Sequence, residues 1–338
     1  MGWNKRGVVR HMNKKYKILL HLGLAKTATS SLQTNVFLKL HNTGEINFLG
    51  VSRASKFYPF SNISRSVLSK KLSKNKLNSL RKQANQMLTS ERLNVLSEEI
   101  YSHSMLFDLN TTFSNLKEVL SDCDIKVLVS LRTPVDELFS YYVQSYYMFR
   151  FTKENTFELF ARSAINSKHR EKYLQFSYED YLSMVSTYFT DLTVILYEDL
   201  VNDKKQYFQS LYGVFNIGSE RVRTMFLSER RNTKEQTNKG KRNKDSIFVE
   251  MIKARISFVR KSKYKAESIW IVSAAWNLLS RLISIIDIKK PGEEHQYPEE
   301  KLAIALRRKF GVDDIGRFSK KYNLNLSKLR KYGYSSRD

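Results

Sequence analysis

The chain has 338 residues, of which 41% are hydrophobic and 12% aromatic, and this composition excludes a disordered protein. Its length is sufficient for a full hydrophobic core, in one large α/β domain or in two smaller ones. Lys and Arg number 58 against 33 Asp and Glu, and the resulting net charge of +25 at pH 7 indicates an anionic partner. The single cysteine, Cys123, excludes an intrachain disulfide and favours a reducing compartment, so we expect a cytoplasmic protein.

Five short runs rich in Ile, Leu and Val predict β-strands, at Tyr16–Leu22, Ile46–Leu49, Leu93–Leu96, Ile125–Leu131 and Leu192–Leu196. They lack strict polar–apolar alternation, as is typical of strands that are buried on both faces of a parallel sheet. Helical patterns lie between them, for example over residues 32–40 and from Pro134 onward. Strands that alternate with helices predict a three-layer α/β fold, in which helices flank a central, mostly parallel sheet.

The first predicted strand runs directly into GLAKTATSS, residues 23–31, which we call the lysine loop. We expect the chain to turn at Gly23 and to begin a helix near Thr27, whose first N–H groups have no partner within the helix. Such a helix start binds phosphate readily, and Lys26 adds a full positive charge. Further hydrogen-bond donors are the hydroxyl groups of Thr27, Thr29 and Ser30. The loop therefore predicts a phosphate or sulfate site; a capping loop without a ligand would explain the hydroxyl residues but not the lysine.

This loop is not a nucleotide-triphosphate P-loop, because Ala25 and Leu20 stand where that motif requires glycine. No G-x-G-x-x-G dinucleotide fingerprint occurs either. A nucleotide kinase with a degenerate phosphate loop is therefore only an alternative interpretation.

A second anion site is predicted where the fourth strand ends at Arg132. Thr133, Pro134 and Asp136 are typical of the first turn of a helix. An arginine at the carboxyl end of a parallel strand lies where α/β sheets bind ligands. Ser140, eight residues after Arg132, is two turns into the helix and could contact the same anion.

Together, the lysine loop and the Arg132–Ser140 pair resemble the sulfotransferases that use 3′-phosphoadenosine 5′-phosphosulfate (PAPS). The resemblance implies a P-loop-like fold, PAPS as the donor, 3′,5′-ADP as the product, and no requirement for a metal. It implies that Arg132 and Ser140 bind the 3′-phosphate. The 5′-phosphosulfate would be bound by Gly23, Lys26, Thr27, Ala28, Thr29 and Ser30. Ala25 departs from this pattern, since many members have proline there.

Two further segments extend the resemblance along the chain. The sequence YEDL, residues 197–200, is similar to a motif at a strand end of this family, and residues 315–334 resemble the C-terminal segment of bacterial carbohydrate-type members. The R-K-G-x-x-G-D-W-K-N signature of the cytosolic branch is absent. The expected acceptor is therefore a hydroxyl or amine group of a carbohydrate or glycolipid, and the positive charge of the chain favours an anionic one.

Sulfuryl transfer needs a base for the acceptor's proton and a cation for the leaving phosphate. Lys26 is the expected cation. The segment Ser97-Glu98-Glu99 resembles the S-S-E that follows a strand in bacterial members, which assigns the base to Glu99. Glu98 is the alternative if the register shifts by one residue, and His103 is the alternative that the cytosolic branch suggests. Without a catalytic role, the two glutamates would be an acidic helix start.

The remaining predictions concern the ends of the chain and a basic segment. We expect a single domain over residues 1–338, with a basic N-terminal tail (1–14), a basic lid loop (230–245) and a helical C-terminal part (246–338). Within the lid, Arg231 and Asn232 are expected to contact the donor. Residues 268–286 predict an amphipathic helix and no membrane span, although the basic stretch before it would allow peripheral contact with the inner membrane surface.

The main rival from another class is a basic nucleic-acid-binding protein without catalysis. It is motivated by the charge of +25. However, Lys and Arg are spread through the chain, and no basic face interleaved with aromatic residues is evident. We therefore expect no nucleic-acid partner. The sequence does not predict the oligomeric state.

Overall fold

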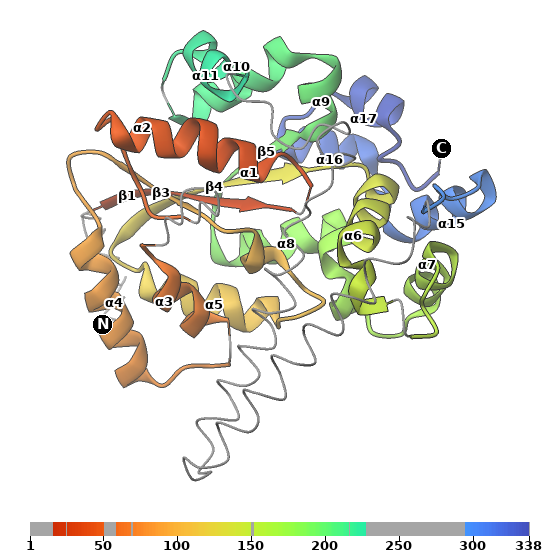
Figure 1. Cartoon of the computed structure of the whole chain (residues 1–338), viewed down its shortest axis with the longest axis horizontal. Helices are drawn as coiled ribbons and strands as arrows, with labels where there is room; N and C mark the ends of the chain where they lie inside the picture. Colours follow the sequence, from red (N-terminus) through yellow and green to blue (C-terminus); the bar gives the residue numbers. More distant parts are fainter. Residues whose placement is uncertain are drawn as a thin grey trace, which may run out of the picture. The chain divides into compact units, whose positions relative to one another are not determined.

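Figure 1 shows the computed structural model of the chain. It describes residues 16–24, 26–50, 59–68, 70–149, 152–215, 217–227 and 295–337. The chain divides into two compact units, Met1–Glu229 with Tyr297–Asp338, and Arg230–Gln296. All the described residues except His295 and Gln296 belong to the first unit.

Several predictions lie outside the described residues. They are the N-terminal tail (1–14), the lid (230–245) with Arg231 and Asn232, and the amphipathic helix (268–286). The expectation of one domain over the whole chain stays a prediction. The described part of the C-terminal region is helical as expected, in α15 (Glu300–Phe310), α16 (Ile315–Tyr322) and α17 (Leu326–Tyr332).

The described residues of the first unit form a five-stranded sheet with the order β2-β3-β1-β4-β5, and every pair of neighbouring strands is parallel. All five predicted strands are confirmed within about two residues at their ends. Their bounds are β1 (Tyr16–Gly23), β2 (Ile46–Phe48), β3 (Leu93–Ser97), β4 (Cys123–Leu131) and β5 (Asp191–Leu196). The predicted three-layer α/β fold, in which helices flank a central parallel sheet, is confirmed.

Helices cover both faces of this sheet (Figure 1). One face carries α1 (Thr29–Ser31), η1 (Leu32–Phe37), α2 (Leu38–Asn42), α10 (Lys204–Phe215) and α11 (Ser219–Leu227). The other face carries α3 (Ser61–Val67), α4 (Lys74–Met87), α5 (Leu109–Val119) and α8 (Tyr178–Tyr188). Successive residues of a strand pack on opposite faces of the sheet. Leu19 lies in the core beneath η1, α2, α10 and α11, and Leu20 lies in the core beneath α3, α4, α5 and α8. This two-sided burial explains why the strands read as continuous apolar runs.

A third core joins α6 (Pro134–Phe149), α7 (Phe157–Asn166) and α15 through an aromatic cluster. Its largest rings are close to one another; the Tyr142 and Phe160 centroids, for example, are 5.3 Å apart. Short helical segments complete the described residues, namely η2 (Glu99–Ser102), η3 (Arg170–Phe176) and α9 (Tyr197–Asn202). Because α6 packs into this core, its first turn is held firmly beside the end of β4.

The strand register brings distant segments of the chain to one edge of the sheet. His21 of β1 lies opposite Ser97 of β3, and Gly23 of β1 lies opposite Ser130 of β4. Leu131 of β4 lies in turn opposite Leu196 of β5. The residues that follow these strands therefore occur side by side at the carboxyl edge, with the lysine loop between the Glu98–Glu99 segment and Arg132.

Candidate functional site

The lysine loop contains two residues with left-handed backbone conformations, Lys26 with φ 67° and Ala28 with φ 65°. A non-glycine residue in this conformation costs about 1–3 kcal/mol, and such strain is concentrated at ligand sites. Left-handed residues alternating with others also form the backbone nests that bind anions. The Lys26 side chain is exposed. The conformation is thus suited to an anion, and a simple helix cap would not require it.

Close packing inside the loop fixes its shape. The Thr27 hydroxyl donates to the Leu24 carbonyl oxygen at 2.7 Å and lies 3.3 Å from the Thr29 hydroxyl. Both threonines are buried. A Cβ atom at Gly23 would lie 2.1 Å from Thr29 Oγ1, so only glycine fits beneath the loop. The Thr27 hydroxyl has one proton, which we expected it to donate to a ligand. In the structure this proton is used for the hydrogen bond to Leu24, which fixes the shape of the loop.

The helix that was predicted to start near Thr27 starts two residues later. The helix begins at Thr29, and the carbonyl oxygen of Ala28 accepts from the N–H groups of Ser31 and Leu32. The left-handed conformation of Ala28 delays the helix. From Leu32 to Phe37 the helix has π-type hydrogen bonding, which is rare and frequently found at functional sites.

A buried histidine beneath the loop links three strands. His21 Nδ1 is 2.8 Å from the Ser97 hydroxyl in β3, and Nε2 is 3.4 Å from the Ser130 hydroxyl in β4. Gln33 of the π-helical segment donates to both the carbonyl and the hydroxyl oxygen of Ser97, at 3.2 Å each. Burial lowers the pKa of His21 to about 3, so the ring is neutral at pH 7. This role of His21 was not predicted from the sequence; a lone histidine inside an apolar strand is the signal that could have indicated it.

Arg132 and Ser140, which we expect to bind the same anion, lie in contact with each other. Arg132 Nη1 donates to the Ser140 hydroxyl at 3.2 Å, and the guanidinium carbon lies 5.0 Å from the centroid of the Tyr197 ring. Arg132 is partly exposed, and no carboxylate in the described ranges forms an ion pair with it. Its positive charge is thus available to an anionic ligand.

The YEDL segment anchors the C-terminal residues behind Arg132. Glu198 accepts from the Thr133 N–H at 2.8 Å and from the buried Tyr334 hydroxyl at 2.7 Å. Burial raises the pKa of Glu198, and the two hydrogen bonds oppose that effect. Asp199 accepts from Lys328 at 2.9 Å and from Tyr332 at 3.1 Å. Residues 197–200 and residues 315–334 therefore form one structural feature, a clasp between α9 and the C-terminal residues.

The three base candidates lie together after β3. Glu98 continues the extended backbone (φ −148°, ψ 112°) and is only 9% exposed, whereas Glu99 begins η2 and is partly exposed. Burial lowers the pKa of His103 to about 4, so this histidine is neutral at pH 7. Its Nδ1 is buried and, within the described residues, has no hydrogen-bond partner. The choice among the three stays a prediction.

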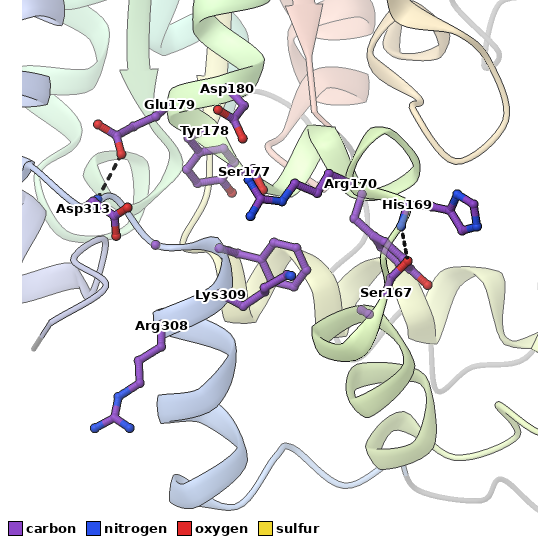
Figure 2. A pocket seen from close by; sticks show the side chains of 14 residues that line it. Ser167, His169, Arg170, Ser177, Tyr178, Glu179, Asp180, Arg308, Lys309 and Asp313 are labelled. Carbon is purple, nitrogen blue, oxygen red and sulfur yellow. Dashed lines mark hydrogen bonds between the residues drawn. The ribbon is translucent and has the colours of Figure 1, made fainter.

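A cavity of about 330 Å³ lies between the end of α7, the start of α8 and the end of α15 (Figure 2). Arg170 and Lys309 contribute positive charge to its wall, while Glu179 and Asp180 contribute negative charge. None of the residues predicted to bind the donor lines it. Its wall includes Tyr178, whose hydroxyl contacts the Arg132 carbonyl oxygen on the site side.

The described residues contain neither a candidate membrane span nor a candidate metal site. No helix among them combines the length and the apolar character that crossing a membrane requires. No group of three or more His, Cys, Asp or Glu side chains is arranged there to hold a metal ion.

No protein-family model matches the chain, and no curated protein sequence matches it. Among solved structures, a sulfotransferase from Alicyclobacillus acidocaldarius is similar, with a TM-score of 0.37 and 18% identity over 60% of this chain and 81% of that one. A retinol dehydratase in complex with androsterone and the inactive cofactor PAP has a TM-score of 0.32 and 12% identity, over 62% of this chain and 63% of its own. Similarity at this level carries no argument about activity, which must be argued from the residues of the chain itself.

The clasp between Glu198 and Tyr334 can be tested by unfolding in urea. Tyr334→Phe should lower the free energy of unfolding by about 1–3 kcal/mol, because the part-buried carboxylate of Glu198 loses one of its donors. Tyr332→Phe is the matched control and should cost less than about 1 kcal/mol, since Asp199 keeps its contact with Lys328. Equal losses in the two variants would contradict a specific role for the Glu198 contact.

Proposed function

We propose that the chain is a sulfotransferase that transfers a sulfuryl group from PAPS to a hydroxyl or amine of a carbohydrate or glycolipid. The observation that carries this proposal is the placement of two anion sites on neighbouring strands. The lysine loop follows β1, the Arg132–Ser140 pair follows β4, and the two strands are paired up to Gly23 and Ser130. A nucleotide with phosphate groups at both its 5′ and 3′ positions suits two such sites.

The groups present fit this donor. The lysine loop offers donors to a 5′-phosphosulfate, namely the N–H groups of its strained backbone and the exposed side chains of Lys26 and Ser30. Gly23 leaves room for Thr29, whose packing shapes the loop. At the second site, a guanidinium held by a serine hydroxyl and an aromatic ring is presented to the 3′-phosphate. The residues at the 5′ site would be Gly23, Lys26, Thr27, Ala28, Thr29 and Ser30, with Thr27 contributing its backbone N–H because its hydroxyl donates to Leu24.

When bound, the donor supplies a sulfuryl group attached to a good leaving group, the 5′-phosphate. Lys26 then has the task of stabilising negative charge on the oxygen that bridges the two. Glu99 takes the proton from the acceptor hydroxyl, and its partial exposure leaves it more accessible than Glu98. His103 is neutral at pH 7 and is retained as the alternative base.

The acceptor class rests on the C-terminal resemblance and on the net charge of +25, which favours an anionic carbohydrate or glycolipid. Cytoplasmic location, contact with the inner membrane surface and the absence of a metal requirement are parts of the same proposal. The direct experiment is isothermal titration with 3′,5′-ADP, using ATP and duplex DNA as competitors. Displacement by either competitor at equal concentration would favour a kinase or a nucleic-acid-binding protein instead.

Arg132→Ala should weaken 3′,5′-ADP binding by about 2–4 kcal/mol, because a charge-assisted contact in a partly buried site is lost. Binding of 5′-AMP, which lacks the 3′-phosphate, should change much less. Arg170→Ala removes a cation from the cavity wall that is not part of the proposed site, and it should leave both affinities unchanged. Equal losses for the two ligands in Arg132→Ala would show that Arg132 is structural.

Lys26→Ala should lower kcat by about 10²-fold or more, because charge on the bridging oxygen develops only in the transition state. Steady-state kinetics would check this, with direct titration of 3′,5′-ADP as the control for donor binding. Normal turnover combined with a raised KM would contradict the role.

Glu99→Gln should lower turnover by about 10²–10⁴-fold while preserving donor binding, since glutamine keeps the shape and removes the base. The activity of the unmutated protein should fall at acid pH as the base becomes protonated. The residual activity of Glu99→Gln should not show this decrease. Glu98→Gln is the matched control and should retain activity. If Glu98→Gln is inactive instead, the register is shifted by one; if both are active and His103→Ala is inactive, the base is the histidine.

A further inference from the structure

Glu137 is a glutamate in the first turn of α6 with an exposed fraction of 0%. Its Oε1 is buried and, among the described residues, has no hydrogen-bond partner. Its Oε2 lies 2.6 Å from the hydroxyl oxygen of Tyr178 in α8. The same hydroxyl contacts the backbone carbonyl oxygen of Arg132. Neither the resemblance nor the proposed chemistry gives this carboxyl a task.

The number of protons in this chain of contacts is informative. The Tyr178 hydroxyl has one proton, whereas a carbonyl oxygen and an ionised carboxylate have none. If Glu137 were ionised, one proton would have to serve two contacts. If Glu137 carries a proton, it donates to Tyr178, and Tyr178 donates to Arg132. Each contact is then a normal hydrogen bond, and the oxygen without a partner belongs to a neutral group, whose burial costs far less than that of a charge.

We propose that Glu137 is a neutral carboxylic acid in the folded protein at pH 7 and that, through Tyr178, it positions Arg132 without neutralising it. This inference rests on the proposed function in one respect, namely that the ligand of Arg132 is the 3′-phosphate. Glu137 is accordingly a positioning residue, because it acts on the anion only through Tyr178 and Arg132.

The surroundings of Glu137 are consistent with a retained proton. Burial is the largest influence and raises the pKa of Glu137 well above its usual value, and the negative charge of Glu198 acts in the same direction. The hydrogen bond from Tyr178 and the charge of Arg132 oppose this rise but are smaller effects. The titratable and charged groups that face Glu137 from the elements around it are Arg132, Tyr178, Tyr181, Glu198 and Tyr334.

A neutral Glu137 matters because a full negative charge this close to Arg132 would compete with an anionic ligand. Ionisation at alkaline pH would also remove the proton that joins Glu137 to Tyr178. Both effects would weaken anion binding at Arg132 as the pH rises. The site therefore gains a fixed backbone at Arg132 without an ion pair that would cancel its charge.

The first test does not involve any ligand. The folded-state pKa of Glu137 is raised, so its contribution to stability is greatest in acid and is lost as the pH rises from the ordinary glutamate value. Glu137→Gln has no proton to release. Above the ordinary pKa of glutamate, unfolding of the unmutated protein releases the Glu137 proton. The ratio of its equilibrium constant for unfolding to that of Glu137→Gln should thus rise by about tenfold per pH unit between about pH 5 and pH 7. A ratio that does not change with pH would overturn the proposal.

Glu179→Gln provides the control for loss of a carboxylate from the neighbouring helix α8, where the side chain is partly exposed. If Glu137→Gln does not fold, infrared spectroscopy of folded protein gives a second measurement. A carbonyl band of a protonated carboxylic acid should be present at pH 7 and should persist in Glu198→Gln, which removes the other glutamate near Arg132 whose pKa is raised. Absence of the band would overturn the proposal.

The second test uses isothermal titration with 3′,5′-ADP. Glu137→Gln should bind within about twofold of the unmutated protein at pH 7, because the amide N–H donates to Tyr178 as the acid does. At alkaline pH the unmutated protein should bind more weakly than the variant. If the stability ratio depends on pH but neither protein binds 3′,5′-ADP, the neutral acid stands and the proposed function fails. If both bind and the ratio is constant, the proposed function stands and the inference about Glu137 fails.

Discussion

The parallel pairing of β1 with β4 is the interaction on which the candidate site depends. It places Gly23 opposite Ser130 and so brings the lysine loop next to Arg132. A shift of one residue would turn the side chains of a strand to the opposite face of the sheet. His21 opposes such a shift, because its buried ring nitrogens reach hydroxyls on both neighbouring strands. A misplaced His21 would leave buried polar atoms without partners, which costs about 1–3 kcal/mol for each group.

The left-handed conformations of Lys26 and Ala28 have to be stabilised by the rest of the loop. The contact from Thr27 to Leu24 and the close fit of Thr29 over Gly23 supply that stabilisation within the loop, and the π-helical segment continues it through Gln33. Strain that is accepted on folding does not have to be introduced when an anion binds. A loop of this kind is therefore organised in advance for the anion that we propose as its ligand.

Local signals account for what the sequence predicted. Apolar runs indicated all five strands, and a proline after Thr133 indicated the start of α6, so Arg132 and Ser140 could be placed together. The helix starts two residues after Thr27 because Ala28 is left-handed, and no local signal in the sequence indicates that conformation. Contacts between distant segments were not predictable: the buried partners of His21, the clasp of Tyr334 on Glu198, and the contact of Tyr178 with Glu137 each depend on how the elements pack.

Two glutamates beside a proposed anion site look contradictory at first, but Glu137 and Glu198 have different partners. Glu198 faces two donors, the Thr133 N–H and the Tyr334 hydroxyl, and lies at the positive end of α6, so its environment can accommodate a negative charge. Glu137 faces a hydroxyl that is also needed by a carbonyl oxygen, and its other oxygen has no donor within the described residues. Glu198 can therefore anchor the start of α6 as a hydrogen-bond acceptor, whereas the neutral Glu137 that we propose acts in the same region as a hydrogen-bond donor. This division holds the backbone of Arg132 from behind and leaves its guanidinium for the ligand.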